Sequence, residues 1–298
     1  MTHTDTSYIT EQYGEVTVLV GAQSGAYPFA NSLLIPGADT TAVIDPSLSL
    51  VGSAPPADLV LITHAHEDHI AGVGKYDVPV HVHDRDRERL QSPEALITGF
   101  DTPPDSFESS VAKMRDFFHV EGIPDAQGFE DGTVFDLGGR TVTVIHLPGH
   151  TAGHSGFLIE PDGFLFVGDI DLTGIGPLYS DVGSSLTDFE ASARRCVDID
   201  AQWYGTSHQK GVIDGAGEFR RRLDAYMGVV QRRDDTMLAF LREPAYFDEI
   251  AERRLVYRPH VEGAHVAPVE RSTAQQHLER LIGQGRVAEV EPGRFRAV

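Results

Sequence analysis

Residues 63–69, Thr-His-Ala-His-Glu-Asp-His, gather three imidazoles and one carboxylate in a short segment. This H-x-H-x-D-H spacing follows an apolar run at 57–62 that is typical of a buried strand. A strand that ends in a tight loop would project these side chains into one small volume. Imidazole nitrogen and carboxylate oxygen suit zinc, and also iron or manganese. The segment therefore predicts a metal site, and a second metal would need donors from elsewhere in the chain.

Three later segments supply such donors, each after a run with a strand pattern. In the first, a Pro-Gly pair breaks the strand and leaves a histidine on the loop. In the second, a glycine and then a carboxylate end an apolar run, and in the third an aromatic stretch precedes the last histidine. These donors are His150, Asp169 and His208.

The order of these motifs resembles the metallo-β-lactamase superfamily of binuclear metallohydrolases, over roughly residues 15–215. The resemblance implies an α/β fold, the αββα sandwich, with two divalent metal ions per chain, Zn²⁺ first and Fe or Mn as alternatives. The implied ligands of the first metal are His64, His66 and His150, those of the second are Asp68, His69 and His208, and Asp169 bridges the two. Asp68 and Asp169 are also the implied catalytic residues, because they would orient a hydroxide shared by the metals.

Two branches of the family differ from this pattern. The antibiotic-degrading branch has a cysteine ligand, whereas the single cysteine of this chain, Cys196, lies in a helical-looking stretch. The flavodiiron oxygen reductases carry glutamate where this chain has His66. The differences argue against a true β-lactamase and favour hydrolysis over redox chemistry.

The ligand set has the residue types of the hydroxyacylglutathione hydrolase (glyoxalase II) branch. It implies hydrolysis of a thioester or ester of acylglutathione or acyl-CoA type, so the expected partner is a small-molecule acyl substrate. The alternatives are a phosphodiesterase or endoribonuclease, a lactonase, and a catalytically idle binding module, which the intact ligand set disfavours. The net charge of −21 would repel phosphate backbones, so nucleic acid is not an expected partner.

Residues 84–133 form an insertion that does not fit a simple alternation of strands and helices. It begins with the charge run 84–89, predicted to be a solvated helix start, and it holds five phenylalanines. The insertion is either part of a substrate pocket or a hydrophobic cluster under a long loop. Candidate substrate-binding residues are Phe117 and Phe118 in the insertion, Tyr179 after the bridging aspartate, and Lys210 after the last histidine.

Two further polar residues have two readings each. Asp45 either supports the H-x-H-x-D-H loop from behind or is a turn residue before Pro46. His154 is predicted to be a support for the metal ligands or a structural histidine.

The catalytic domain is predicted to span residues 1–215 and to open with strands at 16–21, 29–36 and 41–46. Residues 216–298 are predicted to form a small helical, winged-helix-like C-terminal domain. Its expected elements are helices at 218–233, 235–242, 247–250 and 272–282, the last capped by Ser272, and a hairpin within 283–296. Such a tail packs on the catalytic domain or mediates a homodimer.

Residues 1–6 show no basic start and no apolar segment of a signal peptide, and no run approaches the length of a membrane span. A single cysteine agrees with a reducing compartment. We therefore expect a cytoplasmic protein without a membrane partner.

Overall fold

The computed structural model describes residues 7–298. Residues 1–6, to which the prediction of a missing signal peptide applies, lie outside this range. Among residues 7–298, none of the helices combines the length and the apolar character that crossing a membrane requires.

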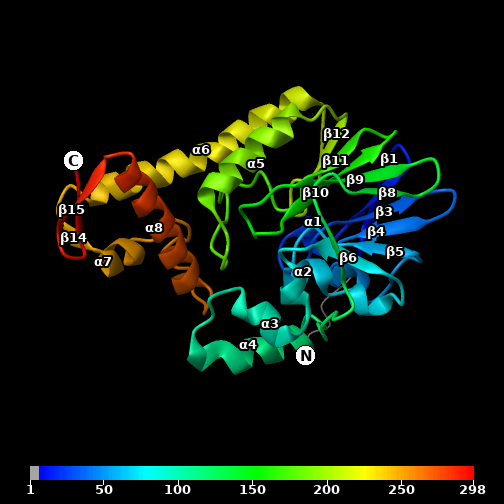
Figure 1. The fold of residues 1–298 in the computed structure, drawn as a ribbon, viewed down its shortest axis with the longest axis horizontal. Coiled ribbons are helices and arrows are strands. Elements are labelled where there is room, and N and C mark those ends of the chain that lie inside the picture. The colour runs from blue at the N-terminus through cyan, green and yellow to red at the C-terminus, as the bar shows by residue number, and fades with distance from the viewer. Residues whose placement is uncertain (1–6) are drawn as a thin grey trace.

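Two β-sheets form the centre of the molecule (Figure 1). The strands of the first sheet lie in sequence order: β1 (Ile9–Tyr13), β2 (Val16–Val20), β3 (Ser32–Pro36), β4 (Thr41–Ile44), β5 (Leu59–Leu61), β6 (Val80–His83) and β7 (Gln127–Phe129). The second sheet has the order β13-β12-β11-β10-β9-β8. Its strands are β8 (Val134–Asp136), β9 (Thr141–His146), β10 (Ser155–Glu160), β11 (Phe164–Phe166), β12 (Trp203–Gly205) and β13 (Val212–Asp214). The three predicted opening strands are present, although the second begins at Ser32.

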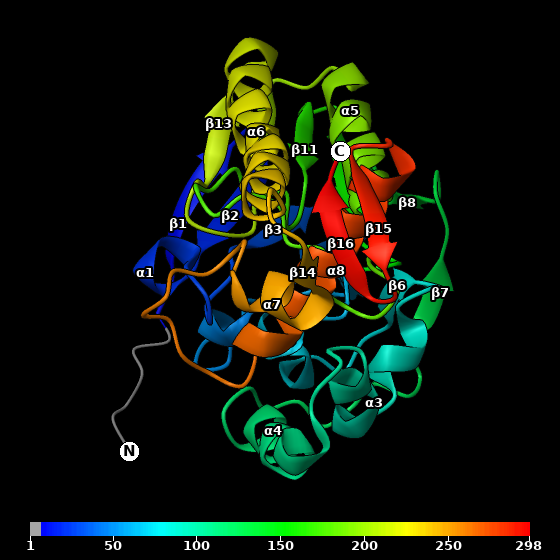
Figure 2. The same cartoon turned by 90° about the vertical axis from the view of Figure 1, so that its left-hand side faces the viewer.

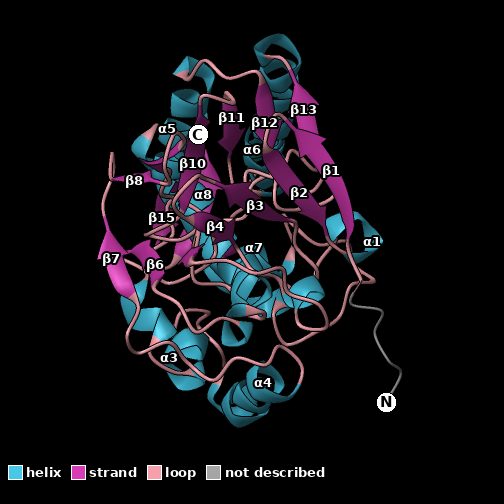
Figure 3. Ribbon diagram, turned by 90° about the vertical axis from the view of Figure 1, so that its right-hand side faces the viewer, coloured by secondary structure: helices cyan, strands magenta, loops and turns pink. Residues whose placement is uncertain are grey.

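The sheets pack face to face, and helices cover both outer faces (Figure 3). Alternation along β5 shows how the sequence directs this layering, because successive strand side chains point to opposite faces. Leu59 and Leu61 enter the core between the sheets, whereas Val60 joins the core under the helices of the first half. The outer face of the second sheet packs against α5 (Leu186–Asp198) and the first half of α6 (Ala216–Phe240). The predicted αββα sandwich is confirmed.

Short helices cover the first sheet. They are α1 (Ala22–Gly25), α2 (Glu67–Ile70), α3 (Pro93–Thr98) and α4 (Pro104–Asp116), with 3₁₀ turns at Leu48–Leu50, Val73–Lys75 and Arg87–Leu90. The insertion at 84–133 contributes α3, α4 and β7. Phe118 is buried in the core beneath these helices, and Phe100, Phe107 and Phe117 are partly buried against it. These phenylalanines form a hydrophobic cluster, and Phe100 also packs on the ring of His66 at 5.1 Å, so the pocket alternative stays a prediction.

The C-terminal part has a core of its own, to which the end of α6 contributes (Figure 2). Its other elements are β14 (Ala245–Tyr246), α7 (Phe247–Glu252), α8 (Val266–Gly283), β15 (Val287–Glu291) and β16 (Arg294–Ala297), with the strand order β14-β16-β15. The predicted hairpin and short helix are confirmed. Because α6 also packs on the second sheet, the domain boundary at 215 and the winged-helix character stay predictions.

Two predicted helix ends in this region are wrong. The helices expected at 218–233 and 235–242 are one continuous helix, α6, because no helix breaker lies between them and Arg233 and Asp234 are both buried in contacts. Ser272 is not an N-cap, since α8 begins at Val266. Pro268 lies in the first turn of α8, where a missing N–H costs little, and it was the overlooked signal.

Strand directions bring the predicted ligands to one end of the sandwich. β4, β5 and β6 are parallel, so the residues that follow them lie at the same edge of the first sheet. In the second sheet, β11 is parallel to β12, and β9 and β11 are both antiparallel to β10. The carboxyl ends of β9, β11 and β12, which precede His150, Asp169 and His208, therefore also share one edge.

Candidate metal centre

Ligand-type atoms of the predicted metal-binding residues converge where the two sheet edges meet. They form two groups, and within each group the atoms lie within 4.8 Å of one another. The first group is His64, His66, His150 and Asp169. The second group is Asp68, His69 and His208. These sets are suited to binding divalent metal.

Asp169 faces both groups. Its Oδ2 atom lies 3.3 Å from Nε2 of His150 and 3.8 Å from Nε2 of His64. Its Oδ1 atom lies 3.2 Å from Nε2 of His69 and 3.6 Å from Nε2 of His208. Burial alone would raise the pKa of Asp169, but the positive potential of the surrounding histidines holds it well below the usual range. One ionised carboxylate is thus placed between the groups, as a bridging ligand must be.

Two histidines of the first group are held by a loop that precedes α5. His150 Nδ1 lies 2.9 Å from the carbonyl oxygen of Leu178, which can only accept, so this nitrogen carries the proton. His66 Nε2 lies 2.8 Å from Oδ2 of Asp181. The pKa of Asp181 is lowered: burial would raise it, but His66 and Arg89 outweigh burial. The nitrogens left free are Nε2 of His150 and Nδ1 of His66.

Asp45, at the end of β4, supports ligands of both groups. Its Oδ2 atom accepts from Nδ1 of His69 at 2.8 Å and from the Thr63 hydroxyl at 2.6 Å. Because that hydroxyl donates to Asp45, its oxygen accepts from Nδ1 of His64 at 2.9 Å. Of the two readings of Asp45, the structure therefore supports the one in which it orients metal ligands.

His208 is oriented by the backbone of α1 and by a second aspartate. Its Nδ1 atom donates to the carbonyl of Gly25 at 2.7 Å, and its backbone N–H donates to Oδ1 of Asp171 at 2.9 Å. Burial, reinforced by the charge of Asp169, raises the pKa of Asp171 to about 7. Asp171 also groups with Asp169 and His208 as a set that could hold a metal.

The spacing of the histidine nitrogens and the buried atoms without hydrogen bonds show whether this site fits a metal. His66 Nδ1 and His150 Nε2 lie 3.1 Å apart, and the other nitrogen of each ring is engaged by Asp181 or by the Leu178 carbonyl. Two nitrogens bound to one tetrahedral zinc would lie about 3.3 Å apart. Within residues 7–298, Nε2 of His64, Nε2 of His69 and Oδ1 of Asp169 are buried without a hydrogen-bond partner. Buried polar atoms rarely stay unpaired, so the donor set fits a divalent cation.

Asp86 ties together the loops that carry the ligands. It is 1% exposed and accepts from the backbone N–H groups of Ala65 and Gly153 and from the hydroxyl of Thr151, at 2.7 to 3.0 Å. The prediction that residues 84–89 form a solvated charge run is therefore wrong at Asp86. The charged residues next to Asp86 in the sequence suggested that it is exposed, whereas tertiary contacts bury its carboxylate.

His154 fixes the backbone of Asp169. Its Nδ1 donates to the Leu147 carbonyl at 2.9 Å, and its Nε2 accepts from the N–H of Asp169 at 3.0 Å. Burial lowers the pKa of His154 to about 3, so the ring stays neutral, as an acceptor must. Gly168 has a φ of +58°, and a Cβ there would lie 2.5 Å from Nε2 of His154, which explains the glycine before Asp169.

The predicted substrate-binding residues are not brought together. Tyr179 and Phe118 are fully buried, which is at odds with direct substrate contact. The Tyr179 hydroxyl instead bonds with His277 and Arg233 of the C-terminal helices. Phe117 is partly buried and Lys210 is exposed, and their roles stay predictions.

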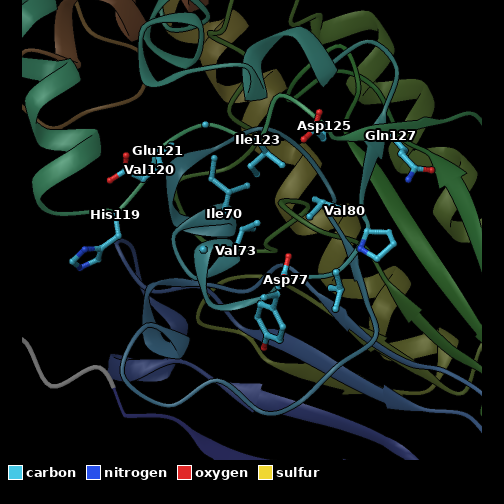
Figure 4. Close-up of a pocket in the computed structure, with 15 residues that line it drawn as sticks. Ile70, Val73, Asp77, Val80, His119, Val120, Glu121, Ile123, Asp125 and Gln127 are labelled. Carbon is cyan, nitrogen blue, oxygen red and sulfur yellow. The ribbon is translucent and has the colours of Figure 1, made fainter.

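A cavity of about 330 Å³ lies elsewhere (Figure 4). Ile70, Val73 and Val80 line its apolar side and Glu121 and Asp125 its polar side. None of the seven predicted metal ligands lines this cavity.

Sequence reasoning missed Asp86, Asp171 and Asp181. Asp171 stands two residues after the bridging aspartate, so its proximity in sequence was a usable signal. Asp181 lies in a glycine-rich loop without strand or helix pattern, and nothing in the sequence indicates that it meets His66.

Comparisons with known sequences place these motifs in a family. The family model for the Metallo-beta-lactamase superfamily matches residues 28–208. An atrochrysone carboxyl ACP thioesterase of Pseudocercospora fijiensis is 26% identical over 238 residues, covering 77% of this chain and 59% of the relative. The acyl-coenzyme A thioesterase MBLAC2 of Bos taurus is 31% identical over 122 residues, covering 39% and 42%. Hydroxyacylglutathione hydrolase GloC of Haemophilus influenzae is 28% identical over 116 residues, covering 39% and 50%. The chain thus spans 42% to 59% of these relatives.

Solved structures show the same fold. A metallo-beta-lactamase family protein from Thermus thermophilus superposes with a TM-score of 0.67 at 24% identity, covering 90% of this chain and 94% of the other. A beta-lactamase domain protein from Burkholderia ambifaria gives 0.68 at 18% identity, covering 97% and 93%. The family model covers more than half of the chain. The predicted ligands lie within or at the end of the matched segment, after strands of the two sheets. This protein belongs to the metallo-β-lactamase superfamily.

Proposed function

We propose that this protein is a hydrolase that cleaves acyl thioesters of the coenzyme A or glutathione type, with two divalent metal ions, most simply Zn²⁺, held by the two groups. The observation that carries the proposal is the placement of the Asp169 carboxylate between two sets of free imidazole nitrogens. Relatives named as thioesterases of acyl carrier protein and coenzyme A, and as a hydroxyacylglutathione hydrolase, share a thioester as the bond that is cleaved.

Metals bound here would lower the pKa of a water molecule and polarise the thioester carbonyl. The chain supplies the orienting groups. Asp68 Oδ2 lies 3.3 Å from Nε2 of His208, so Asp68 and Asp169 both point into the centre, where they can orient a water molecule and accept its proton. Burial raises the pKa of the Cys196 thiol to about 12, so this cysteine is not an alternative nucleophile.

Charge and burial count against two of the alternatives, a nucleic-acid substrate and a lactone bound by Tyr179. Residues 1–210 contain 31 of the 45 acidic residues and 10 of the 24 basic residues, so the part with the metal centre carries the whole charge of −21. A polyanionic phosphodiester would be repelled from it. Tyr179, the candidate substrate-binding residue after Asp169, is not available to a lactone carbonyl, because its hydroxyl is committed to His277 and Arg233.

The test is metal analysis of the purified protein by plasma mass spectrometry, followed by a hydrolysis panel of thioesters, lactones, phosphodiesters and RNA. We expect about two metals per chain, as in other two-metal sites, and turnover of thioesters. Asp169→Asn, which keeps the shape but removes the bridging charge, is the matched inactive control. Cleavage of RNA alone would contradict the charge argument, and a protein that takes up no metal would refute the hydrolase proposal.

A further inference from the structure

The loop at 175–185 carries the groups that hold two ligands of the first group. It contains Leu178, whose carbonyl accepts from His150, and Asp181, whose carboxylate pairs with His66. The loop contains no helix or strand, so regular backbone hydrogen bonds do not fix it. Its shape must come from contacts with neighbouring elements.

Arg233 of α6 holds the first part of this loop. The side chain is 2% exposed, and its Nη1 atom donates to the Pro177 carbonyl at 2.6 Å and to the Tyr179 hydroxyl at 2.8 Å. Its Nη2 atom donates to the Ile175 carbonyl at 2.8 Å. A single buried guanidinium thus fixes the residues on both sides of Leu178.

Two neighbouring residues of α8 hold the same loop from another side. Gln276 Nε2 donates to the Tyr179 carbonyl at 2.7 Å, and its Oε1 accepts from the N–H of Leu186 at 2.6 Å. His277 Nε2 lies 2.7 Å from the Tyr179 hydroxyl, and its Nδ1 lies 2.6 Å from Oδ1 of Asp234 on α6. In Figure 1, the yellow-green loop before α5 lies between α6 and α8.

The histidines of the second group are oriented by other parts of the chain. His69 is held by Asp45, and His208 by the Gly25 carbonyl and by Asp171. These partners all belong to residues 7–215.

We propose, on the basis of the function proposed above, that Arg233, Gln276 and His277 are positioning residues for the metal centre. They fix the residues on both sides of Leu178 and thereby place the carbonyl that orients His150. Asp181, which orients His66, follows in the same loop and also pairs with Arg89. The C-terminal helices are then part of the metal site, and their loosening weakens the metal of the first group without weakening the metal of the second.

The experiment isolates each metal in turn. His208→Ala removes a ligand of the second group, and His66→Ala removes a ligand of the first. Gln276→Leu, which removes the side-chain contacts with Tyr179, Ser184 and Leu186 with little change of volume, is introduced into each background. Zn²⁺ affinity of the metal-free proteins is measured by competition with a chromophoric chelator. In the His208→Ala background, we expect Gln276→Leu to weaken Zn²⁺ binding by roughly tenfold, the lower end for loss of groups that orient ligands. In the His66→Ala background, we expect no change.

Glu190→Gln is the matched control. Glu190 of α5 pairs with Arg280 of α8 at 2.8 Å, so this pair spans the same interface, and within residues 7–298 no ion pair or hydrogen bond of the Glu190 side chain involves the loop or Asp234, which holds His277. Loss of this ion pair should leave Zn²⁺ affinity unchanged in both backgrounds. Thermal unfolding checks that each variant is folded, and Arg233→Met replaces Gln276→Leu if the latter is not.

Distinct outcomes separate this inference from the proposed function. If the wild-type protein binds Zn²⁺ but hydrolyses no thioester, the proposed substrate is wrong. The positioning inference still holds in that case if Gln276→Leu weakens Zn²⁺ binding as expected. Equal weakening in both backgrounds, or by Glu190→Gln, would show a general loss of structure and overturn the inference. Unchanged affinity in Gln276→Leu and Arg233→Met would overturn it as well.

Discussion

The two groups of the metal centre are held in different ways. In the second group, His69 bonds to Asp45 at the end of β4, inside the first sheet. In the first group, His66 and His150 bond to a loop without regular structure. The sheet provides its own hydrogen bonds and a buried core, whereas the loop depends on helices distant in sequence. Two sites with similar ligand types can therefore differ in how easily a mutation outside the site weakens metal binding.

The strongest disturbance should come from the residue that both groups share. Asp169→Asn keeps the size of the side chain but removes the charge that faces all four neighbouring imidazoles. We expect it to lower kcat by about 10²–10³-fold or more, because charge stabilisation of the reacting atoms is lost. Metal analysis after dialysis should show fewer than two ions per chain. Retention of full activity would contradict the bridging role.

The sheet-held group is tested by Asp45→Asn. Asp45 has a φ of +49°, and asparagine tolerates this left-handed conformation as well as aspartate does, so the backbone should not change. The loss of charge behind His69 should weaken binding of the second metal by about 10- to 100-fold. Chelator competition in the His66→Ala background measures it. An effect confined to the first metal would contradict this assignment.

The loop-held group is tested by Asp181→Asn. The carboxylate pairs with His66 and, at 2.7 Å, with Nη1 of Arg89. An amide oxygen can still accept from His66, so we expect a smaller loss of affinity, roughly tenfold, for the first metal only. The measurement is the same competition assay in the His208→Ala background. If Asp181→Asn weakens the second metal as much as the first, the division into two differently held groups is wrong.

The smallest effect should be one of stability. Gly168→Ala places a Cβ 2.5 Å from His154 at a positive φ, whereas Gly132→Ala has a φ of +76° and open space around it. Both variants carry backbone strain of about 1 kcal/mol, but only Gly168→Ala adds a clash, so its loss of unfolding free energy should reach roughly 2–3 kcal/mol. Denaturant unfolding compares the two. Equal losses would mean that His154 moves aside freely.

Much of this comparison was visible in the sequence. Four motifs at strand ends indicated all seven residues of the two groups, because strand patterns, glycines and the order of the donors are local features. The continuous apolar run at 57–62 likewise indicated a buried strand, and its side chains enter the cores on both faces of the first sheet.

Other features were decided only by tertiary structure. Asp86 and Asp181 stand in polar segments with no pattern of their own, and Tyr179 resembled a substrate contact until the fold enclosed it between Arg233 and His277. A local sequence cannot show which carbonyl or carboxylate a distant helix will fix, because such a contact depends on how the C-terminal helices pack against a loop about 50 to 100 residues earlier in the chain. The sequence by itself determined the donors of the metal centre and the strands that carry them. The tertiary structure decided what holds each donor, since hydrogen-bond partners far apart in sequence meet only when the core has formed.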